Sequence, residues 1–561
     1  MTTSRPILLP DSDADPEAGG MTLRVLGIPL ELGASDQDLR QLAVRQAGVQ
    51  EHDVLSMHWV RRSLDARRNR GVFRHVCHVD LVMRSTRESS VLKKALRSGR
   101  VRHAPAREAL KLQAEPGLDR KRSIVVVGSG PGGFFAALTL ALNGARVTML
   151  ERGSALEDRH RKLVPFHRGG PLDRDTNLLF GEGGAGTYSD GKLYTRVQDP
   201  LELAILQELV RAGAPENILF DARAHIGTDR LHRVLPRLRE RLVEAGGEIL
   251  WDTRFEALIQ LGSAGKDKHI AAVRTSRGEI RCDGVVLAIG HSARDTFESL
   301  HEQGVAFESK PFQFGVRVEH PQELITRGRF GDSPAVKELG PASYNLARKG
   351  TDQVLGAHSF CMCPGGKIVA SISEEGMLCT NGMSNAKHSS PYANAALVAT
   401  ISPAAFGGYG EGPLAGLGFQ RHFEKSFFEA GGGNYSAPAQ RIPDFLEGQG
   451  SRGELRSSYT FPVIPGRIDM LLPPDVCKAL TRGLHSFDRQ IEGFAGEEGL
   501  MVGLESRSSS PVRMPRNRDT FCATGYSNLF PIGEGAGFAG GIMSAAIDGA
   551  RAAHVLLRCA K

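Results

Sequence analysis

The N-terminal part of the chain carries short stretches in which apolar and polar residues alternate, and between them lie two stretches with helical spacing. Alternation is typical of half-buried strands, whereas apolar residues three or four apart are typical of amphipathic helices. The predicted elements, in chain order, are Leu23–Pro29, Asp36–Gln46, Val54–Arg61, Phe73–Met83, Glu88–Arg97 and a short strand near Val101. Ser35 is the predicted N-cap of the first helix. This βαββαβ order predicts a ferredoxin-like α+β module over residues 21–104.

A second pattern begins at Ile124, where a run of apolar residues predicts a buried strand. Helices and strands then alternate until about Leu300, which predicts an α/β domain. Within it we expect a three-stranded meander at Phe255–Gln260, Ile270–Thr275 and Glu279–Cys282. From about Pro311 to Pro473 the pattern changes to alternating strands broken by Gly and Pro, and strand, loop and helix return over Met501–Leu557. We interpret the middle stretch as a domain inserted into the α/β domain.

The chain has 561 residues, which is too long for one compact domain. The expected divisions are a tail at 1–20, the module at 21–104, a charged linker at 105–122, the first part of the α/β domain at 123–310, the inserted substrate or cap domain at 311–480 and the second part of the α/β domain at 481–561. The tail is polar and has no apolar signal-peptide core, so we expect it to be disordered. Translation starts at Met1 or at Met21, which opens the first strand pattern.

The strongest chemical signal follows the strand at Ile124. A G-x-G-x-x-G motif is formed there by Gly128, Ser129, Gly130, Pro131, Gly132 and Gly133. A predicted helix at about Phe134–Asn143 and a strand at Val147–Leu150 follow, and the strand ends in Glu151. A strand, glycine turn, helix and second strand with a terminal acidic residue are the fingerprint of dinucleotide-binding Rossmann domains.

Each part of this motif has a physical role in holding a dinucleotide. Gly128 permits a tight turn, Gly130 lets a pyrophosphate approach the backbone, and Gly133 lets helix and strand pack closely. The helix N-terminus supplies N–H groups and a positive dipole end for the phosphates. We expect Glu151 to accept hydrogen bonds from the ribose hydroxyls, and we place Arg152 in the same cofactor site.

The segment Asn528–Gly549 favours FAD over NAD. It contains a short strand, the acidic Glu534 after Gly533, and a predicted helix that begins near Gly541 and Ile542. It resembles the second FAD motif of glutathione-reductase-like and hydroxylase-like flavoproteins. In those proteins an acidic residue, usually Asp, holds the ribityl and pyrophosphate region, and the helix N-terminus points at the flavin pyrimidine. The resemblance implies FAD as the cofactor.

The segment Asp283–Ser292 resembles the strand-to-glycine turn that precedes the substrate domain in the same flavoproteins. This resemblance places Gly290 in the cofactor site. No second complete fingerprint of strand, G-x-G-x-x-G turn, helix and strand with a terminal acidic residue occurs, so we expect no dedicated NAD(P) domain of the disulfide-reductase kind. NAD(P)H remains a candidate transient reductant that binds without such a domain.

Four further segments are long and specific: Phe180–Leu193, Ala224–Asp229, Phe360–Gly366 and Glu505–Arg513. They resemble a family of largely uncharacterised FAD-dependent dehydrogenases, sometimes labelled NAD/FAD-utilising dehydrogenases. The resemblance runs from about Met21 to the C-terminus and implies a cofactor and a fold rather than a substrate. In related flavoproteins the glycine loop of the first segment lies close to the ribityl chain and isoalloxazine, which places Gly183 and Gly184 in the FAD site. The alternative is a flexible surface loop.

Two cysteines that are two residues apart are candidates for redox chemistry. On a strand, Cys361 and Cys363 would face the same side. They are either a thiol pair near the flavin, acting in a redox relay or as a nucleophile, or two buried small residues. The spacing is not C-x-x-C and adjacent strand geometry strains a disulfide, so we favour the second interpretation.

A histidine and several charged residues complete the candidate site. His291 follows the glycine turn and is a candidate general acid or base, with a structural role as the alternative. Arg317 and Glu319, on one alternating strand, either anchor an acidic substrate or form a salt bridge, and we favour the salt bridge. Arg507 and Arg513 flank a Ser-rich turn and are candidates to bind a carboxylate or the flavin, because guanidinium groups suit planar anions.

Charge and cysteine usage narrow the partners. The formal net charge is +7, and residues 61–122 hold 18 Lys or Arg against 6 Asp or Glu. A basic module could contact nucleic acid, a membrane surface or an acidic partner, but we favour a solvated basic face because no RRM-like aromatic motif accompanies Phe73. No apolar run is long enough to span a membrane. Eight scattered cysteines without a secretion signal favour a cytoplasmic protein with no metal site.

The sequence therefore predicts a Rossmann-type FAD-binding domain with an inserted α+β substrate domain and an N-terminal ferredoxin-like module. The favoured function is an FAD-dependent oxidoreductase that transfers hydride between a small organic substrate and flavin N5. One alternative is a flavin-dependent RNA-modifying enzyme that uses the basic module, and another is a non-enzymatic flavin sensor or scaffold. No motif names the substrate, the electron acceptor or the oligomeric state.

Overall fold

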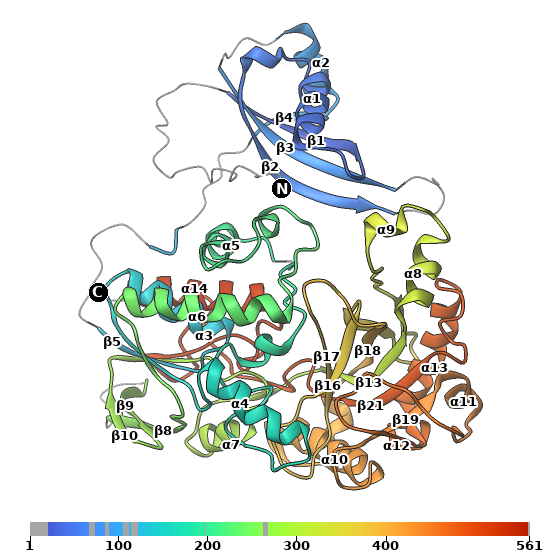
Figure 1. Ribbon diagram of the computed structural model, residues 1–561. Helices are drawn as coiled ribbons and strands as arrows, with labels where there is room; N and C mark the ends of the chain where they lie inside the picture. The colour runs from blue at the N-terminus through green and yellow to red at the C-terminus, as the bar shows by residue number, and fades with distance from the viewer. Residues whose placement is uncertain are drawn as a thin grey trace. The chain divides into compact units, whose positions relative to one another are not determined.

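The computed structural model describes residues 21–66, 73–84, 89–104, 111–113, 122–195, 197–261 and 267–558. The chain divides into two compact units (Figure 1): Met1–Arg107 with Phe220–Ala222, and Glu108–Leu219 with Arg223–Lys561. The predicted tail at 1–20 and most of the predicted linker at 105–122 lie outside the described residues.

The first unit contains a four-stranded antiparallel sheet and two α-helices in the order βαββαβ. Its elements are β1 (Thr22–Glu31), α1 (Asp36–Ala47), η1 (Glu51–Asp53), β2 (Val54–Asp65), β3 (Arg74–Met83), α2 (Ser90–Arg97) and β4 (Val101–His103). The strands lie in the order β2-β3-β1-β4. Ser35 caps α1 as predicted, because its hydroxyl accepts a hydrogen bond from the Asp38 amide at 3.2 Å.

The second unit contains a five-stranded parallel sheet in the order β23-β11-β5-β6-β7. Its strands are β5 (Ser123–Val127), β6 (Arg146–Leu150), β7 (Glu248–Leu250), β11 (Gly284–Leu287) and β23 (Leu529–Pro531). Every residue of β11 is buried, as expected for a parallel strand covered on both faces. The C-terminal strand β23 pairs with β11, with Phe530 opposite Val286. Two distant parts of the sequence thus complete one sheet.

Helices from both parts of the sequence pack together beside this sheet. In Figure 1, α3 (Pro131–Leu142), α6 (Thr228–Glu244) and α14 (Ile542–Arg558) lie side by side, and α3 contacts both of the others. The remaining elements of this region are η3 (Gly184–Tyr188), η4 (Glu216–Leu219), α4 (Leu156–His167), α5 (Glu202–Arg211) and α7 (Arg294–Glu302). The expected meander is an antiparallel sheet of β8 (Phe255–Leu261), β9 (His269–Thr275) and β10 (Gly278–Arg281).

A seven-stranded mixed sheet forms the other half of this unit, in the order β14-β15-β18-β13-β21-β19-β20. Its strands are β13 (Phe312–Pro321), β14 (Ala347–Arg348), β15 (Ala357–Cys363), β18 (Tyr392–Ile401), β19 (Ala437–Arg441), β20 (Val463–Pro465) and β21 (Leu500–Glu505). The expected boundary at residue 480 would remove β21, which lies between β13 and β19. The boundary was misplaced because β21 is a short apolar strand that reads like a strand of the parallel sheet.

Smaller elements surround the seven-stranded sheet. The short strands are β12 (Glu308–Ser309), β16 (Gly366–Ala370), β17 (Thr380–Ser384) and β22 (Val512–Arg513). The helices are α8 (Gln322–Phe330), α9 (Val336–Leu339), η5 (Pro403–Phe406), η6 (Gly412–Leu414), α10 (Ala415–Ala430), α11 (Ile442–Glu447), α12 (Ile468–Leu471) and α13 (Pro474–Asp488). β12 pairs with β22, and β16 pairs with β17.

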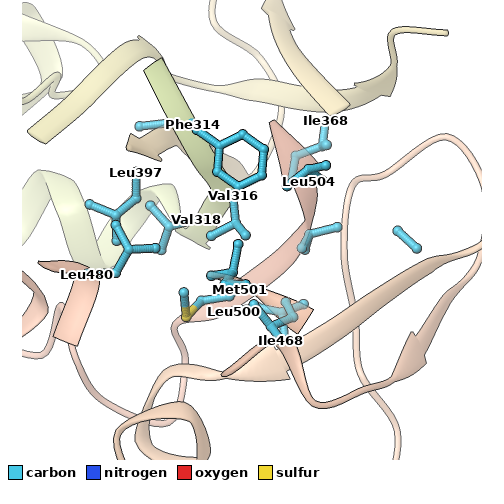
Figure 2. Packing of buried hydrophobic residues seen from close by; sticks show 14 of the residues in the cluster. Phe314, Val316, Val318, Ile368, Leu397, Ile468, Leu480, Leu500, Met501 and Leu504 are labelled. Carbon is cyan, nitrogen blue, oxygen red and sulfur yellow. The ribbon is translucent and has the colours of Figure 1, made fainter. Parts of the chain in front are cut away.

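Alternation along β13 separates an apolar face from a polar one. Figure 2 shows Phe314, Val316 and Val318 packed in a core that also contains side chains from β18, β21 and α13. The intervening residues of β13 include Arg317 and Glu319, which are also buried but belong to the other face. One face of the strand therefore stabilises the core, and the other face carries buried charge.

The backbones of α3 and α14 approach each other closely. A Cβ atom added to Gly549 would lie 2.0 Å from the Gly132 carbonyl oxygen, and one added to Gly132 would lie 3.2 Å from the Ala545 carbonyl oxygen. Only glycine at position 549 permits this separation of the two helices, and the contact at Gly132 is tight.

Substitution of Gly549 by Val is expected to separate α3 from α14. The added side chain has no space, so the free energy of unfolding should fall by about 3 kcal/mol. Urea unfolding followed by circular dichroism measures the change. Arg558→Val, at an exposed position of the same helix, introduces the same side chain without the clash and should change stability by less than about 1 kcal/mol. Equal losses in both variants would show that the close approach is not a constraint.

Candidate functional site

The glycine motif forms the turn between β5 and α3. Gly128 has a φ of +102°, and a Cβ atom there would lie 2.4 Å from the Ala288 carbonyl oxygen. A Cβ atom on Gly133 would lie 1.9 Å from the Gly128 carbonyl oxygen. The N-cap of α3 is Gly130, Pro131 follows it at the first helical position, and no side-chain cap hydrogen bond occurs at this helix end among the described residues. Its first N–H groups therefore remain available to an anion, as a dinucleotide site requires.

Glu151, which follows β6, ties the glycine motif to the glycine-rich loop. Its Oε2 accepts hydrogen bonds from the Ser129 amide at 3.0 Å and the Ser129 hydroxyl at 2.6 Å. Its Oε1 accepts from the amides of Gly153 at 3.0 Å and Gly181 at 2.9 Å. A carboxylate offers about four acceptor positions, so a ribose hydroxyl would replace the hydroxyl of Ser129.

Arg152 is bound by protein carboxylates. Its guanidinium lies 4.3 Å from the ring centroid of Phe180 and donates to Asp175 at 2.9 Å and Asp295 at 2.8 Å. These contacts fix the segment that follows Glu151. A direct contact of Arg152 with a cofactor stays a prediction.

The glycine-rich loop lies directly against the glycine motif. Gly183 and Gly184 have φ values of +78° and +61°, and a Cβ atom on Gly184 would lie 3.3 Å from the Gly130 Cα. A Cβ atom on Gly186 would lie 3.6 Å from Ile542, the first residue of α14. The loop, the glycine motif and the N-terminus of α14 therefore meet at one place.

Arg159 on α4 donates hydrogen bonds to the backbone of this loop, and no feature of the sequence predicted this role. Its fully buried guanidinium donates to the carbonyl oxygens of Asn177 at 2.9 Å, Glu182 at 2.6 Å and Gly184 at 3.0 Å. Burial lowers the pKa of Arg159 to about 10, which leaves it charged at neutral pH. No pattern in the sequence separates it from Arg161, the other arginine of α4, which is exposed.

The C-terminal motif contacts the turn at Gly290. A Cβ atom on Gly535 would lie 2.6 Å from the Gly290 carbonyl oxygen. Glu534 accepts a hydrogen bond from the Ser510 amide at 2.6 Å and lies 3.7 Å from the Lys310 ammonium. Burial raises the pKa of Glu534 above its usual value, although Lys310 opposes the shift.

The beginning of this motif and the start of α14 are fixed by short hydrogen bonds. The Gly533 amide donates to Asp548 at 2.8 Å, and the Gly541 amide donates to the Ser544 hydroxyl at 3.0 Å. Both contacts join the turn to the first half of α14. The predicted cofactor residues Gly533, Gly541 and Ile542 therefore belong to one rigid turn and helix start.

His291 lies beside buried positive charge. Its Nδ1 is 2.7 Å from the Ser292 hydroxyl. Burial, with smaller contributions from Arg507 and Arg294, lowers the pKa of His291 to about 4. The imidazole is therefore neutral at physiological pH. Its catalytic role stays a prediction, and the neutral form is able to accept a proton but not to donate one as an imidazolium.

Arg507 is held in a buried ion network. Its guanidinium donates to both carboxylate oxygens of Glu424, at 2.9 and 2.6 Å, and to the Ser373 hydroxyl at 2.6 Å. Arg294 binds the other side of Glu424 at 2.7 and 3.0 Å. Arg507 therefore has few donors left for a substrate, and sequence could not show this because Glu424 lies 83 positions away.

Arg513 differs from Arg507 in that no carboxylate is paired with its guanidinium among the described residues. Its guanidinium lies 5.5 Å from the ring centroid of Phe538, and its Nε is buried with no hydrogen-bond partner among the described residues. A Cβ atom on Gly537 would lie 3.0 Å from the Arg513 Cα, so Arg513 borders the C-terminal motif. Of the two arginines that flank the Ser-rich turn, Arg513 is the one with an unused donor.

Arg317 forms a salt bridge, but not with Glu319. Its Nη1 donates to Glu505 at 2.8 Å, across the strand pair β13–β21. Glu319 instead accepts a hydrogen bond from the Ser458 amide at 2.9 Å. Residues two apart on a strand share a face, but the closest charged partner lies on the neighbouring strand. Arg317 is fully buried, so an exposed substrate anchor is not its observed state.

Cys361 and Cys363 lie at an irregular end of β15 rather than on a regular strand. Cys361 has a φ of +45°, and the pairing with β18 shifts register between Phe360 and Cys363. The Lys192 ammonium lies 3.9 Å from each sulfur and forms an ion pair with Asp190 at 3.1 Å. The two sulfurs lie on the same side as expected, but the strand is irregular there rather than regular.

The described residues contain neither a recognisable metal-binding group nor a membrane-spanning helix. No group of three or more His, Cys, Asp or Glu residues that could hold a metal ion occurs among the described residues. Among those same residues no helix is both long and apolar enough to cross a membrane.

Known families and proteins resemble this chain. Residues 121–294 match an FAD binding domain, residues 311–508 match the FAD-dependent protein C-terminal domain-like model, and residues 23–80 match a domain of unknown function. An uncharacterised protein of Clostridium beijerinckii is 38% identical over 541 residues, which cover 96% of this chain and 99% of that protein.

Solved structures that resemble the chain are more distant. L-amino acid deaminase from Proteus vulgaris is 13% identical, with a TM-score of 0.35, over 79% of this chain and 95% of that one. L-proline dehydrogenase from P. horikoshii is 12% identical, with a TM-score of 0.32, over 78% of this chain and 93% of that one. These likenesses are too weak to bear on the substrate.

The ion network predicts a specific acid sensitivity. Burial opposes ionisation of Glu424, but Arg294 and Arg507 outweigh it and lower the pKa of Glu424. The stability that this carboxylate contributes is therefore present above its unfolded pKa of about 4.3 and is lost as the pH falls toward its folded pKa. Glu424→Gln should lower the free energy of unfolding by about 3 kcal/mol at pH 7 and weaken its dependence on pH below about 5.

Urea unfolding between neutral and acidic pH measures both effects. Glu429→Gln is the matched control, because Glu429 lies on the same helix in an exposed ion pair with Lys425. It should change stability by less than about 1 kcal/mol at any pH. If the free energy of unfolding of Glu424→Gln fell below pH 5 as steeply as that of the unchanged protein, Glu424 would not be the source of the acid sensitivity.

Proposed function

The chain belongs to a family of FAD-dependent proteins that includes the Clostridium beijerinckii relative, and we propose that it transfers hydride between a small organic substrate and N5 of its flavin. FAD is its cofactor, and it is a flavin-dependent oxidoreductase. The finer placement among glutathione-reductase-like and hydroxylase-like flavoproteins is part of the proposal. The bound flavin would supply the exchange of two electrons as hydride.

The observation that carries the proposal is the meeting of three glycine segments. The motif at Gly128–Gly133, the loop at Gly183–Gly186 and the start of α14 approach one another at van der Waals distance. Gly184 meets the backbone of Gly130, whereas Gly186 meets the side chain of Ile542 at the start of α14. Glycine at these positions lets a dinucleotide approach the backbone closely and leaves the N–H groups of the helix N-termini to bind it.

The chain's own residues would hold the cofactor at defined parts. The N-terminus of α3 would bind the pyrophosphate, and Glu151 would accept from the adenosine ribose. Glu534, which accepts a hydrogen bond from the Ser510 amide, would bind the ribityl region. The N-terminus of α14 would favour negative charge on the flavin pyrimidine.

The chemistry of the substrate is suggested by the residues left unpaired. Among the described residues Arg513 has a buried Nε without a hydrogen-bond partner and no carboxylate paired with its guanidinium, whereas Arg507 and Arg317 are each paired with a buried carboxylate. We propose that Arg513 binds an anionic group of the substrate or of the flavin. His291 in its neutral form is the candidate base.

Anaerobic reduction tests the proposed reaction. The purified yellow protein is mixed with NADH, NADPH and a panel of small metabolites, and bleaching of the flavin absorbance is followed. We expect at least one organic substrate to reduce the flavin at a useful rate. Failure of every reductant would overturn the proposal and favour a flavin sensor or scaffold.

Gly130→Val tests the position of the pyrophosphate. Gly130 has a φ of −65°, and a Cβ atom there meets nothing within 4 Å, so the protein itself tolerates a side chain. The Val side chain would occupy the space above the helix N-terminus, and FAD content should fall at least about tenfold while stability without FAD stays unchanged. Absorbance of released flavin and urea unfolding give the two readouts.

Gly407→Val is the matched control. Gly407 has a φ of −55° and equally open surroundings, but it lies at the end of η5. It should retain FAD at the level of the unchanged protein. Full FAD content in Gly130→Val would show that the pyrophosphate binds elsewhere.

A further inference from the structure

A cluster of ionisable side chains lies where the glycine-rich loop meets the seven-stranded sheet. It consists of Cys361 and Cys363 on β15, Lys192 and Asp190 on the loop, and Arg317 on β13. We call these five residues the thiol cluster. None of them belongs to the three glycine segments that would hold FAD, although Asp190 and Lys192 follow Gly183–Gly186 in the same loop.

Two cations face the two sulfur atoms. The Lys192 ammonium lies 3.9 Å from both sulfurs, and the Arg317 Nη2 lies 4.0 Å from the Cys363 sulfur. Lys192 is also paired with Asp190 at 3.1 Å, which holds the ammonium in place. Positive charge at this distance stabilises a thiolate relative to a thiol.

The backbone brings the two cysteines together. Cys361 has a φ of +45°, a conformation that costs a residue other than glycine about 1 kcal/mol or more. The Cys363 thiol lies 3.3 Å from the Cys361 carbonyl oxygen and also hydrogen-bonds to the Cys361 sulfur. The bulge therefore removes the strand geometry that would keep two sulfurs apart.

The two thiols differ in exposure and in acidity. Cys361 is half-buried, whereas Cys363 is fully buried. The hydrogen bond from Cys363, together with Lys192 and Arg317, holds the pKa of Cys361 well below its usual value despite burial. By contrast, burial raises the pKa of Cys282 to about 12 and of Cys379 to about 11. The cluster thus contains one residue that is partly exposed and carries the more acidic thiol, and one fully buried partner.

We propose that Cys361 and Cys363 form a redox-active dithiol that reduces low-molecular-weight disulfides, with Cys361 as the attacking residue and Cys363 as the resolving residue. The Cys361 thiolate attacks one sulfur of the disulfide, forms a mixed disulfide and releases the other half as a thiolate. The Cys363 sulfur then attacks the Cys361 sulfur, forms the Cys361–Cys363 disulfide and releases the second half.

The reaction balances in protons and electrons. The proton of the Cys363 thiol ends on one of the two released thiolates, so the products are one thiol and one thiolate. The two cysteine sulfurs lose two electrons, and the substrate disulfide gains them. An external thiol reductant returns the pair to the dithiol. This activity goes beyond the proposed flavin reaction and does not require it.

Mass spectrometry of the full-length protein tests the proposal. The protein is incubated with oxidised glutathione, free thiols are alkylated, and the chain is cut with trypsin. The peptide Gly350–Lys367 contains Cys361 and Cys363 and no other cysteine. We expect this peptide to carry an internal disulfide, and in Cys363→Ala we expect it to carry glutathione on Cys361. A peptide that stays alkylated on both cysteines, with no glutathione in Cys363→Ala, would overturn the proposal.

Variants of Lys192 separate activation of the thiol from a structural role. Lys192→Met removes the charge, and the rate of Cys361 alkylation by iodoacetamide near neutral pH should fall about tenfold. Lys192→Arg keeps the charge and should restore most of the rate. Equal rates in both variants would show that Lys192 does not activate the thiol. Should Lys192→Met misfold by circular dichroism, Lys192→Gln provides the same comparison.

The outcome is distinguishable from failure of the flavin reaction. Disulfide formation is read from the peptide mass, and flavin reduction is read from absorbance. A protein that forms the disulfide but is bleached by no metabolite would retain the dithiol activity and lose the proposed function. The reverse result would leave only the flavin reaction.

Discussion

Gly132 on α3 and Gly549 on α14 lie so close that a methyl group on Gly549 would approach the Gly132 carbonyl oxygen to 2.0 Å. This contact joins two helices whose sequences lie some four hundred residues apart. It also fixes where α14 begins, because Ile542 at its N-terminus reaches the loop at Gly186. A wider separation of the helices would move that N-terminus away from the glycine motif, and the site would no longer combine both ends of the second unit.

Buried ion pairs join the parts of this unit by a different kind of contact. Arg294 begins α7, Glu424 lies on α10, and Arg507 follows β21. Guanidinium groups on both sides of one buried carboxylate fix three segments relative to one another, since removal of any member leaves an unpaired charge in a dry interior. The same pairing explains why an arginine that lies near the cofactor motifs, such as Arg507, is not necessarily free to bind a substrate.

The features that could be predicted from sequence are those that depend on the spacing of residues close together in the chain. The strand and glycine turn at Ile124–Gly133, the meander and the N-cap at Ser35 depend on neighbouring residues, so their patterns are visible in the chain itself. The partners of Arg317 and Arg507 depend on strand order and helix packing, which local patterns do not contain. The bulge at Cys361 was also hidden, because alternation predicts a regular strand there.

The position of the thiol cluster follows from the alternation that builds the core. Phe314, Val316 and Val318 occupy the apolar face of β13, so Arg317 must lie on the opposite face. There it meets the end of β15, where it donates to the Cys361 carbonyl oxygen at 3.2 Å. That hydrogen bond anchors the carbonyl of a residue whose backbone is left-handed, with a φ of +45°. The apolar packing on one face of β13 thereby places the positive charge that stabilises the thiol pair on the other.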